Sequence, residues 1–400
     1  MIKAAIMGYG TVGSGVAEVL DVNRVSIAKR AGDEIIIKYV LDLRDFPGDP
    51  VEKKIVHDYR IIADDPEIQI VVETMGGVEP AYTFVRTMLE AGKHVTTSNK
   101  ALVAAKGAEL IALAKEKNVN FMFEASVGGG IPIIRPLNSS LTADEIEEIT
   151  GIVNGTTNYM MTKMSEEGLE FDEVLADAKE RGYAEKDATA DVEGYDACRK
   201  IAILTSLVCG QQVDFEDIYT EGITHISAAD IKYAKAMGRA IKLLASSKKT
   251  EGGYVAMVAP FLLPKEHPLY SVNGVFNAIF VRGNVLGDAM FYGSGAGKLP
   301  TASAVVSDIV EMAKHLNVHI PVEWSSKRVE LVDHKSLKNR YFVRTEASEA
   351  EVEAAFGRVE YFAAEGVLGE RGFLTEQMSE AEYEERAGKL GNVLQMIRVA

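Results

Sequence analysis

Apolar and polar positions alternate along the first third of the chain as a parallel α/β sheet requires. The short apolar runs that predict buried strands lie at residues 2–7, 35–41, 70–73, 94–97 and 120–124. A helical spacing of apolar residues follows the first run, and another covers residues 101–117. Strands that alternate with helices are typical of a doubly wound parallel sheet with helices on both faces. The pattern therefore predicts an α/β protein that begins with a Rossmann-type nucleotide fold.

The first apolar run leads directly into a glycine pattern, Gly8-x-Gly10-x-x-Gly13. Gly8 permits a tight turn, Gly10 lets the backbone approach a pyrophosphate, and Gly13 allows a helix to pack closely on a strand. Thr11 and Val12 then begin a helix whose free N–H groups attract phosphate. A glycine turn without a ligand is the alternative, but the strand–turn–helix context favours a dinucleotide site.

The second predicted strand ends at Asp42, and Arg44 follows two residues later. An acidic residue at this place usually accepts hydrogen bonds from the adenosine ribose of NAD, whereas an arginine can pair with the 2′-phosphate of NADP. The separation between Gly13 and Asp42 is longer than usual. The sequence favours NAD and leaves NADP open.

Polar residues and glycines follow the next two predicted strands. Thr74 and Gly76 lie in a second glycine turn, and Ser98 and Lys100 come directly after the run at 94–97. Loops at the carboxyl ends of parallel strands bind the ligands of such sheets. A lone lysine in a loop is usually solvated, but this position favours a functional role for Lys100 and predicts cofactor contacts for the other three residues.

Composition narrows the possible functions. The 400 residues contain 43 Lys and Arg against 59 Asp and Glu, a net charge of −16 that argues against a nucleic-acid partner. The sequence shows neither a signal peptide nor an apolar run long enough to span a membrane, so we expect a cytoplasmic protein. Cys198 and Cys209 are the only cysteines, and both are interpreted as packed helix residues and not as a disulfide or zinc site.

The strand and helix alternation breaks at the three consecutive glycines 128–130. Their backbone carbonyls, together with Glu124, could form an oxygen-only cation site, although spacing alone favours a hinge between domains. Farther on, residues 153–158 form a polar turn that is suited either to binding a carboxylate or amine or to capping a helix.

A predicted helix from Asp191 through Val208 begins with acidic residues and continues as a strongly apolar segment. Glu193, Asp196 and Lys200 would share one face of this helix, with Asp196 and Lys200 at the i,i+4 spacing that favours an ion pair. A solvated surface pair is the alternative. Because the helix looks largely buried, a lysine flanked by carboxylates is the better candidate for proton transfer.

This last region also resembles a known family. The pattern Ala178-x3-Gly-Tyr-Ala, followed by Asp187 and by Asp-Val-x-Gly-x-Asp-x3-Lys over residues 191–200, is similar to the homoserine dehydrogenase signature. The segments GYGTVG, TTSNKALV, EASVGGGIPII and GIVNGTTNYM resemble that family in the same order, from residue 1 to about residue 330. One departure is Ala188, where the family usually has proline, and we expect it to affect only the order of the loop.

The resemblance implies an enzyme that interconverts L-homoserine and L-aspartate 4-semialdehyde with NAD or NADP. Lys100 and Lys200 would be the catalytic lysines, with Asp196 orienting Lys200, and which lysine takes the proton stays open. The residues implied for the substrate are Asn154, Gly155, Thr156, Tyr183, Glu185 and Asp191.

The resemblance also assigns roles to the two glycine-rich segments. Carbonyls of Val127, Gly129 and Ile131, with Glu124 beside them, would hold a monovalent cation, with sodium as the expected ion. The segment that contains Gly295 and Gly297 precedes a predicted helix at 300–316 and would close over the cofactor.

These expectations divide the chain into three domains. Residues 1–133, completed by 297–320, would bind the nucleotide, and residues 134–296 would form an α+β substrate and dimerisation domain. Residues 337–400 resemble a small ferredoxin-like ACT domain, read either as a structural or dimerising module or as a regulatory site for threonine. A homodimer or homotetramer is expected.

Two other readings compete with this one. A related NAD(P)-dependent amino-acid or polyol oxidoreductase of similar build would turn over aspartate or sugars and ignore homoserine. A cofactor-sensing regulatory protein would use the tail as its working part, but it would have no use for a lysine among Glu185, Asp191 and Asp196.

Overall fold

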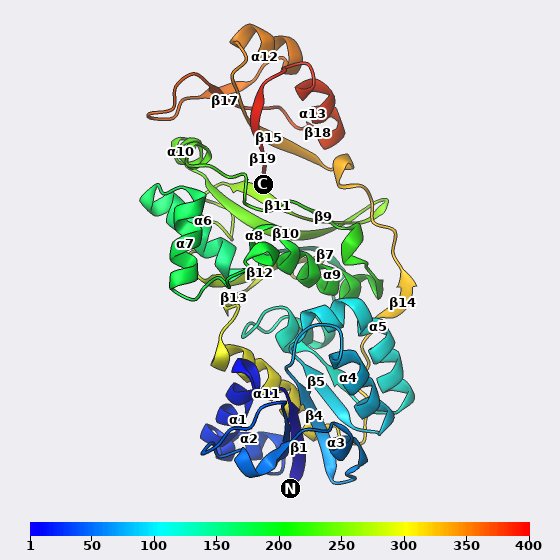
Figure 1. The fold of residues 1–400 in the computed structure, drawn as a ribbon. Coiled ribbons are helices and arrows are strands. Elements are labelled where there is room, and N and C mark those ends of the chain that lie inside the picture. Colours follow the sequence, from blue (N-terminus) through cyan, green and yellow to red (C-terminus); the bar gives the residue numbers. More distant parts are fainter. The chain divides into compact units, whose positions relative to one another are not determined.

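The structure, a computed structural model that describes residues 1–400, consists of two units (Figure 1). Unit 1 contains Met1–Glu145, Ala202–Phe215 and Phe291–Val329. Unit 2 contains Ile146–Ile201, Glu216–Met290 and Glu330–Ala400. The chain therefore passes between the units several times, and each unit is completed by segments that are distant in sequence. No helix is both long and apolar enough to cross a membrane.

Unit 1 is built on a six-stranded parallel sheet in the order β3-β2-β1-β4-β5-β6. Its strands are β1 (Ile2–Met7), β2 (Ile35–Leu41), β3 (Ile55–Val56), β4 (Ile68–Glu73), β5 (His94–Thr97) and β6 (Phe121–Met122). The helices are α1 (Thr11–Val22), α2 (Arg24–Ala31), α3 (Arg60–Asp64), α4 (Ala81–Glu90), α5 (Lys100–Glu116) and α11 (Lys298–Lys314). This strand order is that of the dinucleotide-binding fold, so the Rossmann prediction is confirmed.

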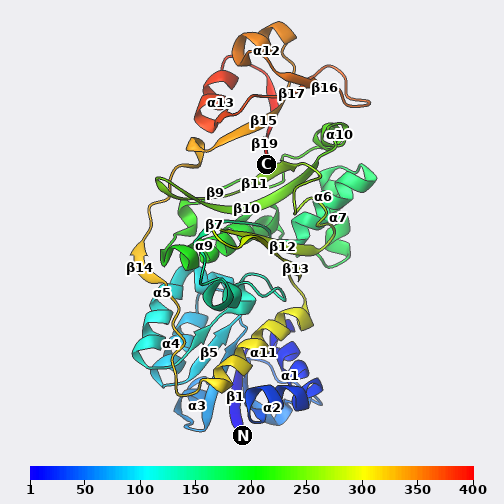
Figure 2. The same ribbon diagram turned by 180° about the vertical axis from the view of Figure 1, so that it is seen from behind.

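The late helix α11 completes the core of unit 1, and Figure 2 shows it beside α1. A Cβ added at Gly15 would lie 2.8 Å from the backbone oxygen of Lys298, so only glycine allows the two helices to approach this closely. Val16, Val305 and Ile309 are fully buried in the cluster that the two helices form with the central strands. Burial of these side chains, at about 1.5–3 kcal/mol each, holds α11 on the sheet. A short parallel pair, β8 (Gln211–Gln212) and β14 (Ser325–Arg328), also belongs to unit 1.

Unit 2 is built on an eleven-stranded sheet whose main path is β13-β12-β7-β10-β11-β19-β15-β17-β16. Its strands before the tail are β7 (Ile146–Ile152), β9 (Tyr219–Thr220), β10 (Ala240–Thr250), β11 (Gly253–Leu263), β12 (Phe276–Gly283) and β13 (Gly287–Ser294, which continues into unit 1). Its helices before the tail are α6 (Gly155–Glu167), α7 (Phe171–Glu180), α8 (Thr189–Val192), α9 (Tyr195–Cys209, which continues into unit 1) and α10 (Ala228–Ala236). The predicted α+β region is therefore a mixed sheet with helices.

Apart from the two-residue strand β18, the tail has the strand–helix–strand–strand–helix–strand order of a ferredoxin-like fold. Its elements are β15 (Lys338–Thr345), α12 (Glu349–Phe356), β16 (Glu360–Phe362), β17 (Arg371–Leu374), β18 (Met378–Ser379), α13 (Glu380–Ala387) and β19 (Val393–Val399). Strand β19 pairs antiparallel with β15 and parallel with β11. The strands of the tail therefore continue the main sheet of unit 2.

Several sequence-based boundaries were wrong. The predicted helix from Asp191 is two helices, because Gly194 has a φ of +82° that breaks the helix before α9 begins. Glu193 therefore does not share a helical face with Asp196 and Lys200. The predicted strand at 120–124 is only two residues long, since a 3₁₀ turn begins at Glu124. Helix α11 begins two residues before the predicted start, with Gly297 as its N-cap.

Candidate active site

The glycine turn after β1 has the close packing that its residue pattern predicts. Gly8 has a φ of +95°, and a Cβ added at Gly13 would lie only 2.0 Å from the carbonyl oxygen of Gly8. Thr74 donates its hydroxyl to the same oxygen at 2.8 Å. The turn therefore brings α1 directly onto β1, with Gly10 as the N-cap and Thr11 and Val12 as the first helical residues.

Asp42 and Arg44 form an ion pair beside this turn. The Arg44 guanidinium donates to both carboxylate oxygens, at 3.0 and 3.1 Å, and the backbone N–H of Tyr9 donates to Asp42 at 2.8 Å. The hydrogen bond from Arg44 is the main reason that the pKa of Asp42 is lowered to about 2. Both residue types that discriminate between NAD and NADP are thus present and paired with each other.

Glu73, which the sequence analysis missed, joins the two loops at the carboxyl ends of β4 and β5. Its buried carboxylate accepts from the backbone N–H of Met75 at 2.6 Å, from that of Gly76 at 3.4 Å, and from the Thr97 hydroxyl. Burial raises the pKa of Glu73. The signal available in the sequence was an acidic residue at the end of an otherwise apolar strand.

The loop that leads to Lys100 is held by its neighbours. Asn99 caps α5 by accepting from Leu102 N–H at 3.1 Å, and its amide donates to the carbonyl of Gly77 at 2.6 Å. Lys100 is the first residue of α5 and is half-buried, whereas Ser98 N–H donates to the backbone oxygen of Glu73 at 3.3 Å. The predicted cofactor residues of both loops therefore lie on one connected backbone network.

The triple-glycine turn does not use Glu124 as a free ligand. Both carboxylate oxygens of Glu124 accept backbone N–H groups, from Ile133, Ile134 and Arg135, at 2.7 to 2.8 Å. A Cβ added at Gly128 would lie 2.3 Å from the carbonyl oxygen of Ile131, so the turn requires glycine there.

The glycine turn also contacts the second glycine-rich segment. A Cβ added at Gly129 would lie 2.2 Å from the backbone oxygen of Gly295, and Gly130 N–H donates to Ser294 at 3.0 Å. Val127 and Ile131 are buried, and no hydrogen-bond donor meets their carbonyls or that of Gly129. Oxygen atoms of this kind are the ligands that hard cations prefer.

Unit 2 gathers four of the predicted polar residues into one buried cluster. The Asn154 amide donates to Asp191 at 2.7 Å and to Asp196 at 3.0 Å, so one side chain connects the two carboxylates. Lys200 donates to Asp196 at 2.7 Å and to the Val153 carbonyl at 2.7 Å. The lysine side chain is 10% exposed and that of Asp196 8%. The ion pair is therefore largely desolvated, which rules out the alternative of a solvated surface pair.

The turn at the start of α6 supports this cluster. Asn154 caps α6 by accepting from Thr157 N–H at 2.8 Å, and Gly155 is the first helical residue. Thr156 donates its hydroxyl to the Tyr183 carbonyl at 2.6 Å, which joins the turn to the loop that follows α7. Glu185 lies on the same loop but is exposed, and no contact joins it to the cluster.

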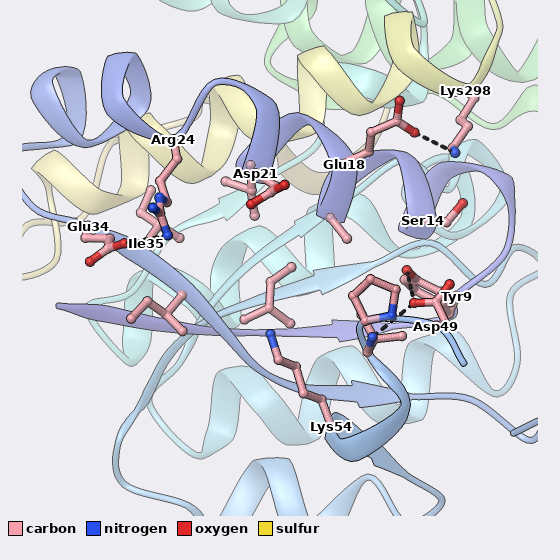
Figure 3. Close-up of a pocket in the computed structure, with 16 residues that line it drawn as sticks. Tyr9, Ser14, Glu18, Asp21, Arg24, Glu34, Ile35, Asp49, Lys54 and Lys298 are labelled. Atoms are coloured by element: carbon pink, nitrogen blue, oxygen red, sulfur yellow. Dashed lines mark hydrogen bonds and ion pairs between the residues drawn. The ribbon is translucent and has the colours of Figure 1, made fainter. Parts of the chain in front are cut away.

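A cavity of about 520 Å³ lies along α1 in unit 1 (Figure 3). Two ion pairs lie on its wall, Lys298 with Glu18 at 2.7 Å and Arg24 with Glu34 at 3.6 Å. None of the predicted site residues lines the cavity.

Comparisons with known proteins agree with this arrangement. A family model described as the NAD-binding domain of homoserine dehydrogenase matches residues 8–124, and one described as homoserine dehydrogenase matches residues 132–310. A homoserine dehydrogenase of Pseudomonas aeruginosa is 39% identical over 411 residues, covering 100% of this chain and 92% of that protein.

The chain belongs to the homoserine dehydrogenase family. It is accordingly an NAD(P)-dependent oxidoreductase that acts on an alcohol group. The crystal structure of a homoserine dehydrogenase from Thiobacillus denitrificans covers 100% of this chain and 98% of its own, with a TM-score of 0.92 and 35% identity. A hyperthermophilic archaeal homoserine dehydrogenase in complex with NADPH covers 78% of this chain and 97% of its own, with a TM-score of 0.65 and 29% identity.

Membership of the homoserine dehydrogenase family makes the two polar networks the natural candidates for its sites. The glycine turn, Asp42 and the loops held by Glu73 lie within the matched NAD-binding domain, and the cluster of Asn154 and Lys200 lies within the region matched by the homoserine dehydrogenase model. The structure joins Asn154, Asp191, Asp196 and Lys200 directly, whereas it leaves Glu185 apart.

Proposed function

We propose that the cluster in unit 2 binds L-homoserine and that Lys200 handles the proton of its hydroxyl group. The observation that supports this most strongly is the buried contact between Lys200 and Asp196 at 2.7 Å. Two of the three ammonium hydrogens are donated to Asp196 and to Val153, which fixes the direction of the side chain. The third hydrogen is left to meet the oxygen of the substrate, where a positioned acid or base assists the reaction.

The neighbouring carboxylate supports recognition of an amino acid. Asp191 and Asp196 both accept from the amide of Asn154, which holds the two carboxylates side by side. A carboxylate is the group that forms charge-assisted hydrogen bonds with the ammonium of an amino acid. We propose that Asp191 receives the amino group of homoserine, with Glu185, Tyr183 and the turn at 154–156 as further substrate contacts.

In unit 1 we propose that the glycine turn and α1 hold the pyrophosphate of the dinucleotide. The bound nicotinamide supplies the chemistry of the reaction by accepting hydride from the alcohol carbon or returning it to the aldehyde. Lys100 and the loops fixed by Glu73 position the nicotinamide end, and Lys100 is proposed as the second catalytic lysine. The glycine segment with Gly295 and Gly297 closes over the cofactor.

We propose that the site accepts NADP as well as NAD. The NAD preference suggested by Asp42 rests on a carboxylate free to receive ribose hydroxyls, but both oxygens of Asp42 already accept from Arg44. This pairing weakens the case for NAD, and a guanidinium is the kind of group that recognises a 2′-phosphate. The related archaeal enzyme was solved with NADPH, in line with this proposal.

A monovalent cation, with sodium as the expected ion, fits the triple-glycine turn. The carbonyls of Val127, Gly129 and Ile131 lack hydrogen-bond donors and belong to buried residues, which is the donor set that a hard cation takes. Glu124 would act beside them as the anchor of the following turn. The ion would stabilise the turn against the segment at 293–296 and takes no part in the proton step.

We further propose a homodimer formed through the outer edge of the unit 2 sheet. Strand β13 is the last strand of the main path, and Leu286, Met290 and Tyr292 on or beside it are about half exposed, at 55%, 46% and 55%. Exposed apolar side chains on a sheet edge are typical of self-association. Cys198 and Cys209 form no disulfide and are at least half-buried, which is compatible with the expected cytoplasmic location.

The decisive experiment compares Lys200→Ala with Lys163→Ala. The second variant removes the i,i+4 ion pair between Lys163 and Glu167 on α6. The oxidation of L-homoserine is monitored through the reduction of NAD or NADP. Loss of a positioned acid or base lowers kcat by about three orders of magnitude in Lys200→Ala with little change in cofactor affinity. Lys163→Ala should retain the rate of the wild type. A Lys200→Ala enzyme with near-normal turnover would show that the proposed proton role is wrong.

A further inference from the structure

The last strand of the chain carries a fully buried arginine that joins the tail to the body of unit 2. Arg398, on β19, is 0% exposed and donates to both carboxylate oxygens of Glu380, at 2.8 and 2.5 Å. Its remaining nitrogen donates to Glu221 at 2.6 Å. Glu380 belongs to the tail, whereas Glu221 does not. One guanidinium therefore bridges the tail and a segment that precedes it by more than a hundred residues in sequence.

Glu221 belongs to a short segment that is fixed on several sides. Strand β9 pairs with β11, and the backbone N–H of Glu221 donates to Val258 at 2.8 Å. The Tyr219 hydroxyl donates to the same carboxylate at 3.1 Å, and its ring lies under the Arg398 guanidinium at 5.0 Å. The arginine is thus one of the contacts that hold this segment, residues 219–223, in place.

The segment in turn packs against the junction between α8 and α9. A Cβ added at Gly222 would lie 2.1 Å from the carbonyl oxygen of Val192, so the two backbones touch. Ile223 N–H donates to the same oxygen at 2.8 Å. A Cβ added at Gly194, where the chain turns into α9, would lie 3.2 Å from the Thr220 side chain.

This junction separates the two carboxylates of the substrate cluster. Asp191 lies on α8 and Asp196 lies in the first turn of α9, and both accept from Asn154. A displacement of the junction would change the separation of the carboxylates, because Asp191 and Asp196 lie on opposite sides of it in the chain. Misplacement of binding groups by about 1 Å is enough to lower catalysis by up to a hundredfold.

We propose that Arg398 and Glu221 are positioning residues, through which the tail fixes the spacing of Asp191 and Asp196 in the homoserine site. The inference rests on the proposed roles of those two carboxylates. It gives the tail a function in substrate binding that requires no effector: the last strand acts as a fixed part of the site's support.

A second arginine of the tail provides a matched comparison. Arg344, on β15, pairs with Glu370 at 2.7 Å and with Asp230 of α10 at 2.7 Å, and both arginine side chains are at most 10% exposed. It also joins the tail to the body of unit 2, but α10 does not carry the substrate carboxylates. If the arginines only stabilise the tail, breaking either pair has the same consequence for activity.

The test measures kcat and KM for homoserine and for the cofactor in Glu221→Gln, in Arg398→Lys and in Asp230→Asn, with thermal unfolding as a check of folding. We expect Glu221→Gln to raise the KM for homoserine about tenfold with an unchanged cofactor KM. Arg398→Lys, which keeps the charge, should show a smaller rise. Asp230→Asn should lower the melting temperature and leave the KM for homoserine within about twofold of the wild type.

Two further variants separate the outcomes. Gly222→Ala keeps the ion cluster but pushes on Val192, and it should raise the homoserine KM as Glu221→Gln does. Asp191→Asn tests the proposed function itself: if it leaves the homoserine KM unchanged, the assignment of the carboxylates fails and the inference with it. If Asp191→Asn raises that KM but Glu221→Gln and Gly222→Ala do not, the proposed function stands and the positioning role of the tail is refuted. Equal KM effects in Glu221→Gln and Asp230→Asn also refute it.

Discussion

Lys242 offers a quantitative test of how unit 2 is held together. This lysine of β10 is 3% exposed and donates to three neutral oxygens: the side chains of Asn158 and Asn273, at 3.1 and 2.8 Å, and the Val272 carbonyl, at 2.6 Å. Lys242 therefore joins α6, the helix that begins at the proposed substrate turn, to the loop before β12. No carboxylate bonds to the ammonium, and burial lowers the pKa of Lys242 from 10.5 to about 8.

The lowered pKa makes the stability of the protein depend on pH in a definite direction. Between about pH 8 and 10.5 the unfolded chain holds the proton of Lys242 while the folded chain releases it, so the free energy of unfolding rises with pH. The difference between the two pKa values corresponds to about 3 kcal/mol. This contribution is present above pH 10.5 and is lost as the pH falls through 8.

Chemical denaturation followed by circular dichroism, repeated from pH 7 to 11, measures this effect against Lys242→Met. Between pH 7 and 11 the free energy of unfolding of the wild type should rise by about 3 kcal/mol relative to that of the variant. This change is expected whatever the absolute loss of stability from the missing hydrogen bonds. Lys248→Met is the control, because Lys248 lies on the same strand with its side chain 47% exposed. A constant difference between wild type and Lys242→Met at every pH would refute the reasoning.

Two further predictions concern unit 1. Arg44→Ala removes the guanidinium from both oxygens of Asp42, so the ratio of kcat/KM for NADP to that for NAD should fall at least tenfold, and an unchanged ratio would exclude a role in cofactor choice. Gly13→Ala places a methyl group 2.0 Å from the Gly8 carbonyl, which must displace α1 from β1. Titration by NADH or NADPH fluorescence should then show affinity weakened at least tenfold, and affinity equal to the wild type would contradict the proposed phosphate site.

The sequence predicted the framework of unit 1 well because its signals are local. An apolar strand, three glycines and a helix form one continuous segment, and the pattern of that segment specifies both the turn and its ligand class. The same holds for the Asp196–Lys200 pair, since an i,i+4 spacing on a helix brings the two side chains together whatever surrounds them.

Other parts of the site were beyond prediction because they depend on distant residues. Nothing near Asn154 in the sequence indicates that its amide connects Asp191 with Asp196. The bonding of Glu124 to residues 133–135 depends on a tight turn. The pairing of Asp42 with Arg44 is local, but it depends on the rotamers of two side chains, which the sequence does not specify. The break at Gly194 was missed because a glycine within a helical pattern is tolerated as often as it ends the helix.

The order in which the two units are completed has a consequence for synthesis of the chain. The sheet of unit 1 lacks α11 until residues 298–314 have been made, although its first strand is at residue 2. In unit 2, β11 cannot pair with β19 until the chain has been made as far as Val399. Neither unit can bury its full core until most of the chain has left the ribosome, and such long-range pairing is slow and exposes apolar surface. A nascent chain stalled before residue 390 should therefore keep the β11 edge open and be unusually dependent on chaperones.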